Sequence, residues 1–135
     1  MSALRQMVYA MMTNSFVLSG LGYAAHVYPA YSPDSPVEDR FLVLRWGGTS
    51  RGIGAANPVI LNSWVYNREP DYGPIGDALA EIRALVESLP AVRLQDGSGN
   101  AVLGVFWEGE SGDLYDPAYR AYMRNSSHTI TASGS

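Results

Sequence analysis

The chain has 135 residues, of which 47% are hydrophobic and 16% are charged, so its composition is that of one globular domain and not of a disordered segment. It contains no cysteine, which excludes disulfides and thiolate metal sites. The formal net charge is −4 and all nine basic residues are arginine, with no arginine run, so a basic nucleic-acid footprint and lysine-based catalysis are both excluded.

The N-terminal segment predicts an amphipathic helix over residues 3–14, capped by Ser2. Its apolar residues recur at helical spacing and form one stripe of core-filling side chains: Leu4, Met7, Val8, Met11 and Met12. Polar residues at positions 13–15 interrupt the apolar stretch. The segment therefore fits neither a signal peptide nor a membrane span, and we expect a soluble protein without a cleaved signal.

Residues 20–40 contain two glycines and three prolines, which predicts a long loop and a candidate contact surface. Two apolar runs follow, FLVLRW at 41–46 and VILNSWVY at 59–66, and each predicts a strand.

The glycine-rich stretch GGTSRGIGAA at 47–56 separates these two strands, and its sequence resembles the cofactor loop of short-chain dehydrogenases. A dinucleotide loop must open directly into a helix, whereas Asn57 and Pro58 here lead into a strand pattern. The Tyr-x-x-x-Lys motif of those enzymes also needs a lysine. We therefore interpret the stretch as a connection between strands and expect no cofactor.

The next segment gives the strongest helix signal in the chain. Its apolar stripe consists of Ile75, Leu79, Ile82, Val86 and Leu89. We expect the helix to begin at Asp71 or Tyr72, with Pro74 in its first turn, and to end at Pro90. Arg83 and Glu87 can pair on its exposed side.

Three further strands complete the chain. Residues 92–94 and 101–107 flank QDGSGN, which predicts a hairpin, and residues 119–131 predict a half-exposed last strand. The element order indicates one α+β domain over residues 1–135, with a mixed, mostly antiparallel sheet of about five strands packed by two amphipathic helices.

The segment WEGESGDLYDPAY holds four carboxylates, at Glu108, Glu110, Asp113 and Asp116. Their spacing is not that of a calcium loop, and no third polar group accompanies them as in a carboxylate-pair hydrolase. An acidic loop that meets arginines of a neighbouring subunit is the favoured interpretation. The histidines, His26 and His128, are interpreted as surface or strand residues, because no nucleophile elbow is present. We expect no catalytic and no metal-binding residues.

A family resemblance rests on three sequence segments: FLVLRWGGTSRG, VILNSWVYNREPDYGPIGDALAEIRALVESL and WEGESGDLYDPAY. Together they resemble tail terminator proteins of long-tailed, siphovirus-type bacteriophages, particularly those of actinobacterial hosts, over residues 27–131. The resemblance implies a structural virion protein without enzymatic activity. Such proteins form a ring, typically a hexamer, that caps the tail tube, stops its polymerisation and provides the surface for head–tail joining.

The implied partners are further copies of the chain, the major tail tube protein and a head-side connector or stopper protein. DNA would pass through the ring without sequence-specific binding, and no membrane is involved. The implied location is the virion tail at the head–tail junction, after assembly in the host cytoplasm. Another head–tail connector or neck protein of the same virion stays open as an alternative, and so does a small nucleotide-binding enzyme.

Three loops are expected to make the assembly contacts: residues 28–39, 47–57 and 108–116. Loop tyrosines are common at interfaces, although they can equally fold back onto their own domain. Arginines outside the acidic segment are candidates for charge pairs across subunits. The interface candidates are Tyr28, Tyr31, Arg45, Arg51, Arg68, Glu108, Glu110, Asp113, Tyr115 and Asp116.

Overall fold

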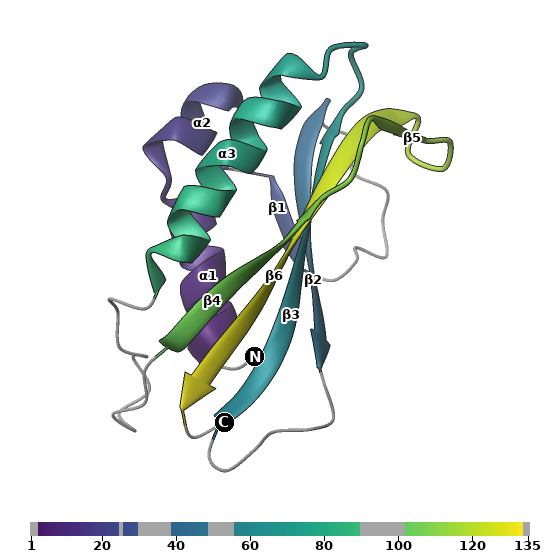
Figure 1. The fold of residues 1–135 in the computed structure, drawn as a ribbon. Coiled ribbons are helices and arrows are strands. Elements are labelled where there is room, and N and C mark those ends of the chain that lie inside the picture. Colours follow the sequence, from purple (N-terminus) through teal and green to yellow (C-terminus); the bar gives the residue numbers. More distant parts are fainter. Residues whose placement is uncertain (1–2, 25, 30–38, 49–55, 90–101, 134–135) are drawn as a thin grey trace.

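A computed structural model describes residues 3–24, 26–29, 39–48, 56–89 and 102–133 (Figure 1). The helices and strands follow one another in the order α1 (Ala3–Thr13), α2 (Phe16–Leu21), β1 (Val27–Pro29), β2 (Arg40–Gly48), β3 (Ala56–Asn67), α3 (Gly73–Glu87), β4 (Val102–Glu110), β5 (Leu114–Asp116) and β6 (Ala121–Ser133).

The strands form one sheet in the order β1-β2-β3-β6-β4, with β5 paired to β6 beside the end of β4. Only β1 and β2 run parallel, and the other neighbours are antiparallel. The three helices lie on one face of the sheet (Figure 1). The predicted α+β class with a mixed, mostly antiparallel sheet is confirmed, and the described residues contain six strands and three helices where about five and two were expected.

The main core lies between the sheet and the helices. Because side chains alternate across a strand, every second residue of β2, β3 and β6 points toward the helices. Leu44, Leu61 and Ile130 meet the apolar stripe of α3 there, including Leu79 and Ile82, and all five are buried. The periodicity read from the sequence therefore identified the packed side of α3.

The two predicted helices are confirmed with small changes at their ends. Helix α1 stops at Thr13, one residue before the predicted end. Helix α3 carries Pro74 in its first turn, as expected, and Tyr72 is its N-cap residue without a side-chain hydrogen bond. The predicted pair on its exposed side is present, with Arg83 Nε 3.0 Å from Glu87 Oε1.

The prediction of one unbroken loop over residues 20–40 is wrong. Helix α2 reaches Leu21 because the Ser15 hydroxyl accepts the N–H of Leu18 at its start and Gly22, at φ 89°, closes its end. Strand β1 then pairs with β2 in parallel. Its last residue is Pro29, which an edge strand tolerates. Residues 30–38 of the predicted loop lie outside the described residues.

The chain after the glycine stretch forms a strand, as predicted, and not the helix that a dinucleotide site needs. Strand β2 runs on to Gly48 and β3 begins at Ala56, so both strands are longer than expected. Pro58 stands inside β3, one position beyond the last β2–β3 pair, Gly48 with Val59. Its missing N–H therefore costs no hydrogen bond to β2. Residues 49–55 lie outside the described part of the chain.

The loop predicted over residues 108–116 is wrong at both ends, because β4 continues to Glu110 and Leu114–Asp116 forms β5. The final strand is confirmed as β6, which lies inside the sheet between β3 and β4. The predicted strand at 92–94 and the QDGSGN turn fall outside the described residues. In the described residues, no helix has the length and apolar character needed to cross a membrane.

Candidate assembly surfaces

The face of the sheet opposite the helices is called the open face here, because no helix among the described residues packs on it (Figure 1). Its two halves differ. One half carries a buried aromatic cluster. The other half, called the exposed half, is crossed by the row Gly47, Ile60, Thr129 and Phe106, read across β2, β3, β6 and β4.

The aromatic cluster is built on Phe41 of β2 and Tyr66 of β3, whose rings stack with centroids 4.5 Å apart. Tyr119 packs edge-on against both rings, and Tyr28 of β1 packs edge-on against Phe41. Burial raises the pKa of Tyr66 above its ordinary range. The candidate Tyr28 thus folds back onto its own domain.

Arg68 belongs to the same cluster. Its Nε donates a hydrogen bond to the Tyr119 carbonyl at 3.2 Å, and its guanidinium lies 5.3 Å from the Phe41 ring centroid. A cation above an aromatic face is attracted to it. These contacts give Arg68 a role inside the chain, and its role between subunits stays a prediction.

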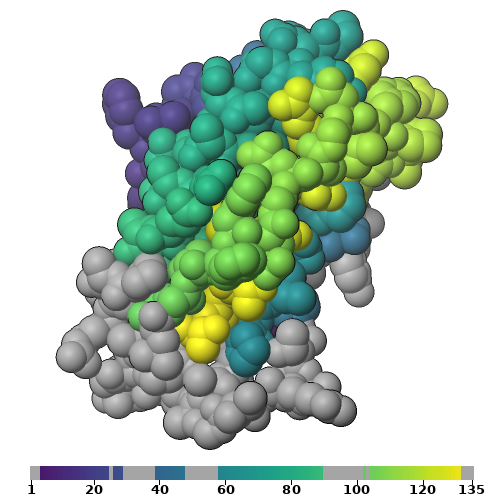
Figure 2. Space-filling model, viewed as in Figure 1, coloured from purple at the N-terminus to yellow at the C-terminus, as the bar shows by residue number. Residues whose placement is uncertain are grey.

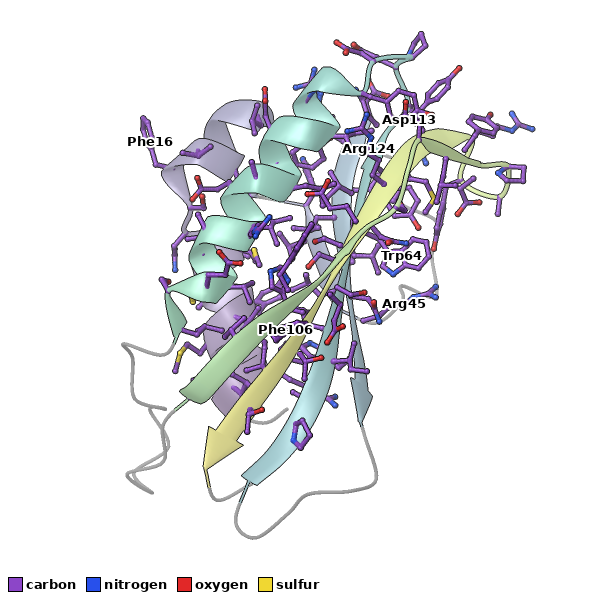
Figure 3. All side chains as sticks on the ribbon, viewed as in Figure 1. Phe16, Arg45, Trp64, Phe106, Asp113 and Arg124 are labelled. Atoms are coloured by element: carbon purple, nitrogen blue, oxygen red, sulfur yellow. The ribbon has the colours of Figure 1, made fainter. Side chains whose placement is uncertain are left out.

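The exposed half carries opposite charges at its two sides. Arg45 on β2 is exposed, and its guanidinium lies 5.3 Å from the Trp64 ring centroid (Figure 3). Glu108 on β4 is exposed, and its Oε1 accepts a hydrogen bond from the Thr129 hydroxyl at 2.8 Å. Beside Glu108 stands Phe106, with 65% of its surface exposed. The sequence identified both charges, but not Phe106.

Two of the predicted interface carboxylates are used inside the chain. Asp113 forms an ion pair with Arg124 of β6 (Figure 3). Asp116 accepts the N–H of Ala118 at 2.9 Å and holds the turn before β6. Glu110 is exposed at the end of β4. In the described residues, no group of three or more acidic, histidine or cysteine side chains is arranged to hold a metal ion.

Two further apolar patches lie on the surface. On β5, Leu114 is 42% exposed and Tyr115 is 52% exposed, with the Tyr115 ring edge-on to Tyr122 at 5.1 Å. At the start of α2, Phe16 is 91% exposed and points away from the molecule (Figure 3). The Phe16 patch was missed because α2 was missed. The candidates Tyr31 and Arg51 lie outside the described residues.

His128 is buried on the helix side of β6, so the interpretation as a strand residue is right and a surface position is wrong. Neither ring nitrogen has a hydrogen-bond partner among the described residues. Burial lowers the pKa of His128; the negative charge of Glu87 opposes this with a smaller effect, and the positive charge of Arg83 lowers the pKa further. Trp107 lies opposite His128, under the Arg83 guanidinium at 4.0 Å.

Comparison with known proteins gives a match at the level of fold. No protein-family model matches the sequence, and no curated protein matches it. The structure is similar to a chain in the virion of a native gene transfer agent particle, with a TM-score of 0.72 over 94% of this chain and 92% of that chain. The two sequences are 16% identical, so the likeness establishes a shared fold along nearly the whole length of both chains.

Proposed function

We propose that the chain is a structural virion protein without enzymatic activity, and specifically a tail terminator. It would cap the tail tube as a ring, stop tube polymerisation and provide the surface for head–tail joining. The observation that carries this proposal is the nearly full-length fold likeness to a chain of a virion particle. The resemblance of residues 27–131 to tail terminators supports the finer role.

The surfaces of the fold suit a protein that works by assembly. A sheet with helices on one side leaves the exposed half of the open face and the Phe16 patch at the surface of the described residues. Phe16 and Phe106 are exposed aromatic side chains, a residue type that is enriched at protein interfaces relative to the rest of the surface. A closed ring built from such contacts can present one face to the tube and a different face to the head.

The main alternative is another head–tail connector or neck protein of the same virion. The matched particle is described as a whole virion, a description that names neither tail nor neck. A neck protein would share a similar size and a ring habit, so the two roles differ in the partner that each contacts.

Mixing the purified protein with the tail tube protein of the same virion separates these roles. Negative-stain electron microscopy should show tubes capped at one end by a ring, with elongation blocked at that end. Tubes of unlimited length without caps would reject termination and favour the neck role. Thermal melting with millimolar NAD or NADP tests the enzyme alternative, because a ligand that binds the folded state must raise its stability. We expect no change.

A further inference from the structure

Two of the exposed apolar patches lie on opposite sides of the molecule. The Phe16 patch on α2 also includes Val17, which is 46% exposed. The other, called the β5 patch, consists of the exposed side chains Leu114 and Tyr115. In the space-filling view the purple atoms of the N-terminal helices lie at the left and the yellow-green atoms around β5 lie at the right (Figure 2). One copy of the chain therefore cannot bring its own two patches together.

The Phe16 patch is carried by a helix that is anchored at both ends. The Ser15 hydroxyl accepts the N–H of Leu18 at the start of α2, and Gly22 closes its end. Leu18 itself is fully buried in the main core. These contacts hold Phe16 in an outward position, as Figure 3 shows. Covering an apolar ring that is held in water is favourable, because the hydrophobic effect scales with the apolar area removed from water.

The β5 patch is also held in place by the body of the chain. The Tyr72 hydroxyl, at the start of α3, donates a hydrogen bond to the Leu114 carbonyl at 2.9 Å. The Tyr115 ring packs edge-on against Tyr122 of β6, with the ring centroids 5.1 Å apart. The backbone of β5 is thus fixed while the side chains of Leu114 and Tyr115 stay exposed. A surface that is already ordered loses less conformational entropy when a partner binds.

Both patches are electrically neutral in a chain whose net charge is −4. Residues 14–24, which include α2, contain no charged side chain. Residues 111–124, which include β5, contain two aspartates and two arginines, and Asp113 is directly paired with Arg124. Copies of an acidic chain repel one another, and a contact between two neutral segments adds no further pair of like charges. The charge of each patch therefore suits the other patch on a second copy.

We propose that copies of this chain join head to tail, with the Phe16 patch of one copy packed against the β5 patch of the next. Phe16 and Val17 then lie against Leu114 and Tyr115 of the neighbour, and a ring covers both patches of every copy. A contact between unlike patches closes a ring when the rotation between copies allows it. This inference rests on the proposed ring and identifies its subunit contact.

The small size of the contact predicts where the ring closes. A buried aromatic side chain contributes about 150–250 Å², whereas a stable interface buries about 1,200–2,000 Å² in total. The two patches supply only two aromatic and two aliphatic side chains, each of them partly or largely exposed. We therefore expect a monomer in dilute solution and a ring on the tube end, where neighbouring sites raise the effective concentration of copies.

Cysteine cross-linking tests the contact directly, because the chain has no cysteine of its own. The single variants Val17→Cys and Leu114→Cys keep both aromatic side chains. They are mixed in equal amounts on cysteine-free tube protein and treated with a short bismaleimide. We expect covalent dimers from the mixture and none from either variant by itself, because the contact joins unlike patches. The matched control mixes Val17→Cys with Phe106→Cys, which is exposed but lies on the open face, and it should give no dimer.

A charge placed in the neutral patch gives an independent test. Phe16→Asp should leave the melting temperature unchanged, because Phe16 is almost entirely exposed and an acidic residue suits the first turn of a helix. Added to the Val17→Cys variant, it should abolish both the dimers with Leu114→Cys and the capped tube ends. Phe16→Leu is the matched control, which keeps an apolar side chain and should preserve both. Undiminished dimers with Phe16→Asp would overturn the contact.

The outcomes separate this contact from the proposed function. Capped tubes with dimers from the mixture support both. Capped tubes without these dimers overturn the contact and leave termination standing, and a loss of capping by Phe16→Asp would then assign the Phe16 patch to the tube protein. Dimers from Val17→Cys by itself would mean that like patches meet, which also overturns the head-to-tail contact. Dimers from the mixture with uncapped tubes support the contact and reject termination. Uncapped tubes without dimers overturn both.

Discussion

The two faces of the sheet are made by the same strands, yet they are stabilised in different ways. On the helix side, aliphatic residues such as Leu44 and Ile130 pack against α3 in one continuous core. On the open face, a compact aromatic cluster around Phe41 is followed by an exposed half that carries Phe106. Stability therefore depends on the whole of one face and on only part of the other, which leaves the exposed half available for assembly.

The two halves of the open face should differ most in their contribution to stability, which is tested by replacing a phenylalanine in each half. Phe41→Ala removes a fully buried ring that Tyr66 and Tyr119 contact, and it should lower the free energy of unfolding by about 3–5 kcal/mol. Phe106→Ala is the matched control and should change that free energy by less than about 0.5 kcal/mol. Urea denaturation measures both. Equal losses would mean that the two halves are not distinct.

The helix side should respond to loss of a core side chain in α3. Leu79→Ala opens a cavity under the helix, and we expect a loss of about 2–5 kcal/mol in the free energy of unfolding. Asp77→Ala, on the exposed side of the same helix, should stay within about 0.5 kcal/mol. Guanidinium denaturation of the two variants gives the comparison. A cost at Asp77 as large as that at Leu79 would contradict the assignment of the packed side.

The short helix α2 should depend on its cap. Ser15→Ala removes the hydroxyl that accepts the Leu18 N–H, at an expected cost of about 1 kcal/mol. Ser19→Ala, an exposed position in the same helix, should be neutral or slightly stabilising because alanine favours helix. Thermal melting of the pair tests the cap, and an unchanged melting temperature for Ser15→Ala would show that α2 is held by packing alone.

The helix side should also be the side that responds to mild acid. Burial holds the pKa of His128 below its ordinary value of 6.5, so the unfolded chain takes up a proton more readily than the folded chain. The stability contributed by the neutral ring is complete above that value and declines as the pH falls through it. His128→Leu should flatten this decline. The test is to measure the free energy of unfolding of the unmodified protein and of the His128→Leu variant at about pH 7.5 and 5.5. An equal decrease in that free energy for the two proteins would exclude His128 as the cause.

The sequence predicted the elements whose signals are local and periodic. The apolar stripe of α3, with Pro74 at its start, predicted the helix correctly. The apolar runs of β2 and β3 predicted the two strands correctly. Helix α2 was missed because six residues give too short a period, although Ser15 and Gly22 are its caps and could have been recognised. Strand β1 has only three residues, and its pairing with Leu42–Leu44 is not encoded locally.

The roles of the interface candidates stay predictions, because the sequence does not say which side chains meet. Arg68 and Asp113 were expected to face neighbours, yet each has partners from distant parts of its own chain, Tyr119 and Arg124. Phe106 lies in an apolar run, and its position on the open face of β4, at the side of the sheet, exposes it. Composition identifies interface-prone residue types, whereas topology decides which of them stay outside.

The order of strands also bears on how the protein is made. Strand β6 follows β3 and β4 in the sequence but lies between them in the sheet. The sheet therefore forms only when β3 pairs with residues far along the chain, as Ala56 does with Ser133 and Asn67 with Tyr122. Until residues 121–133 leave the ribosome, β3 lacks one of its two neighbouring strands and β4 lacks the strand that pairs with it. Pairing over such long separations slows folding and leaves strand edges open to other chains. Crowded nascent copies therefore face a period in which mispairing competes with folding.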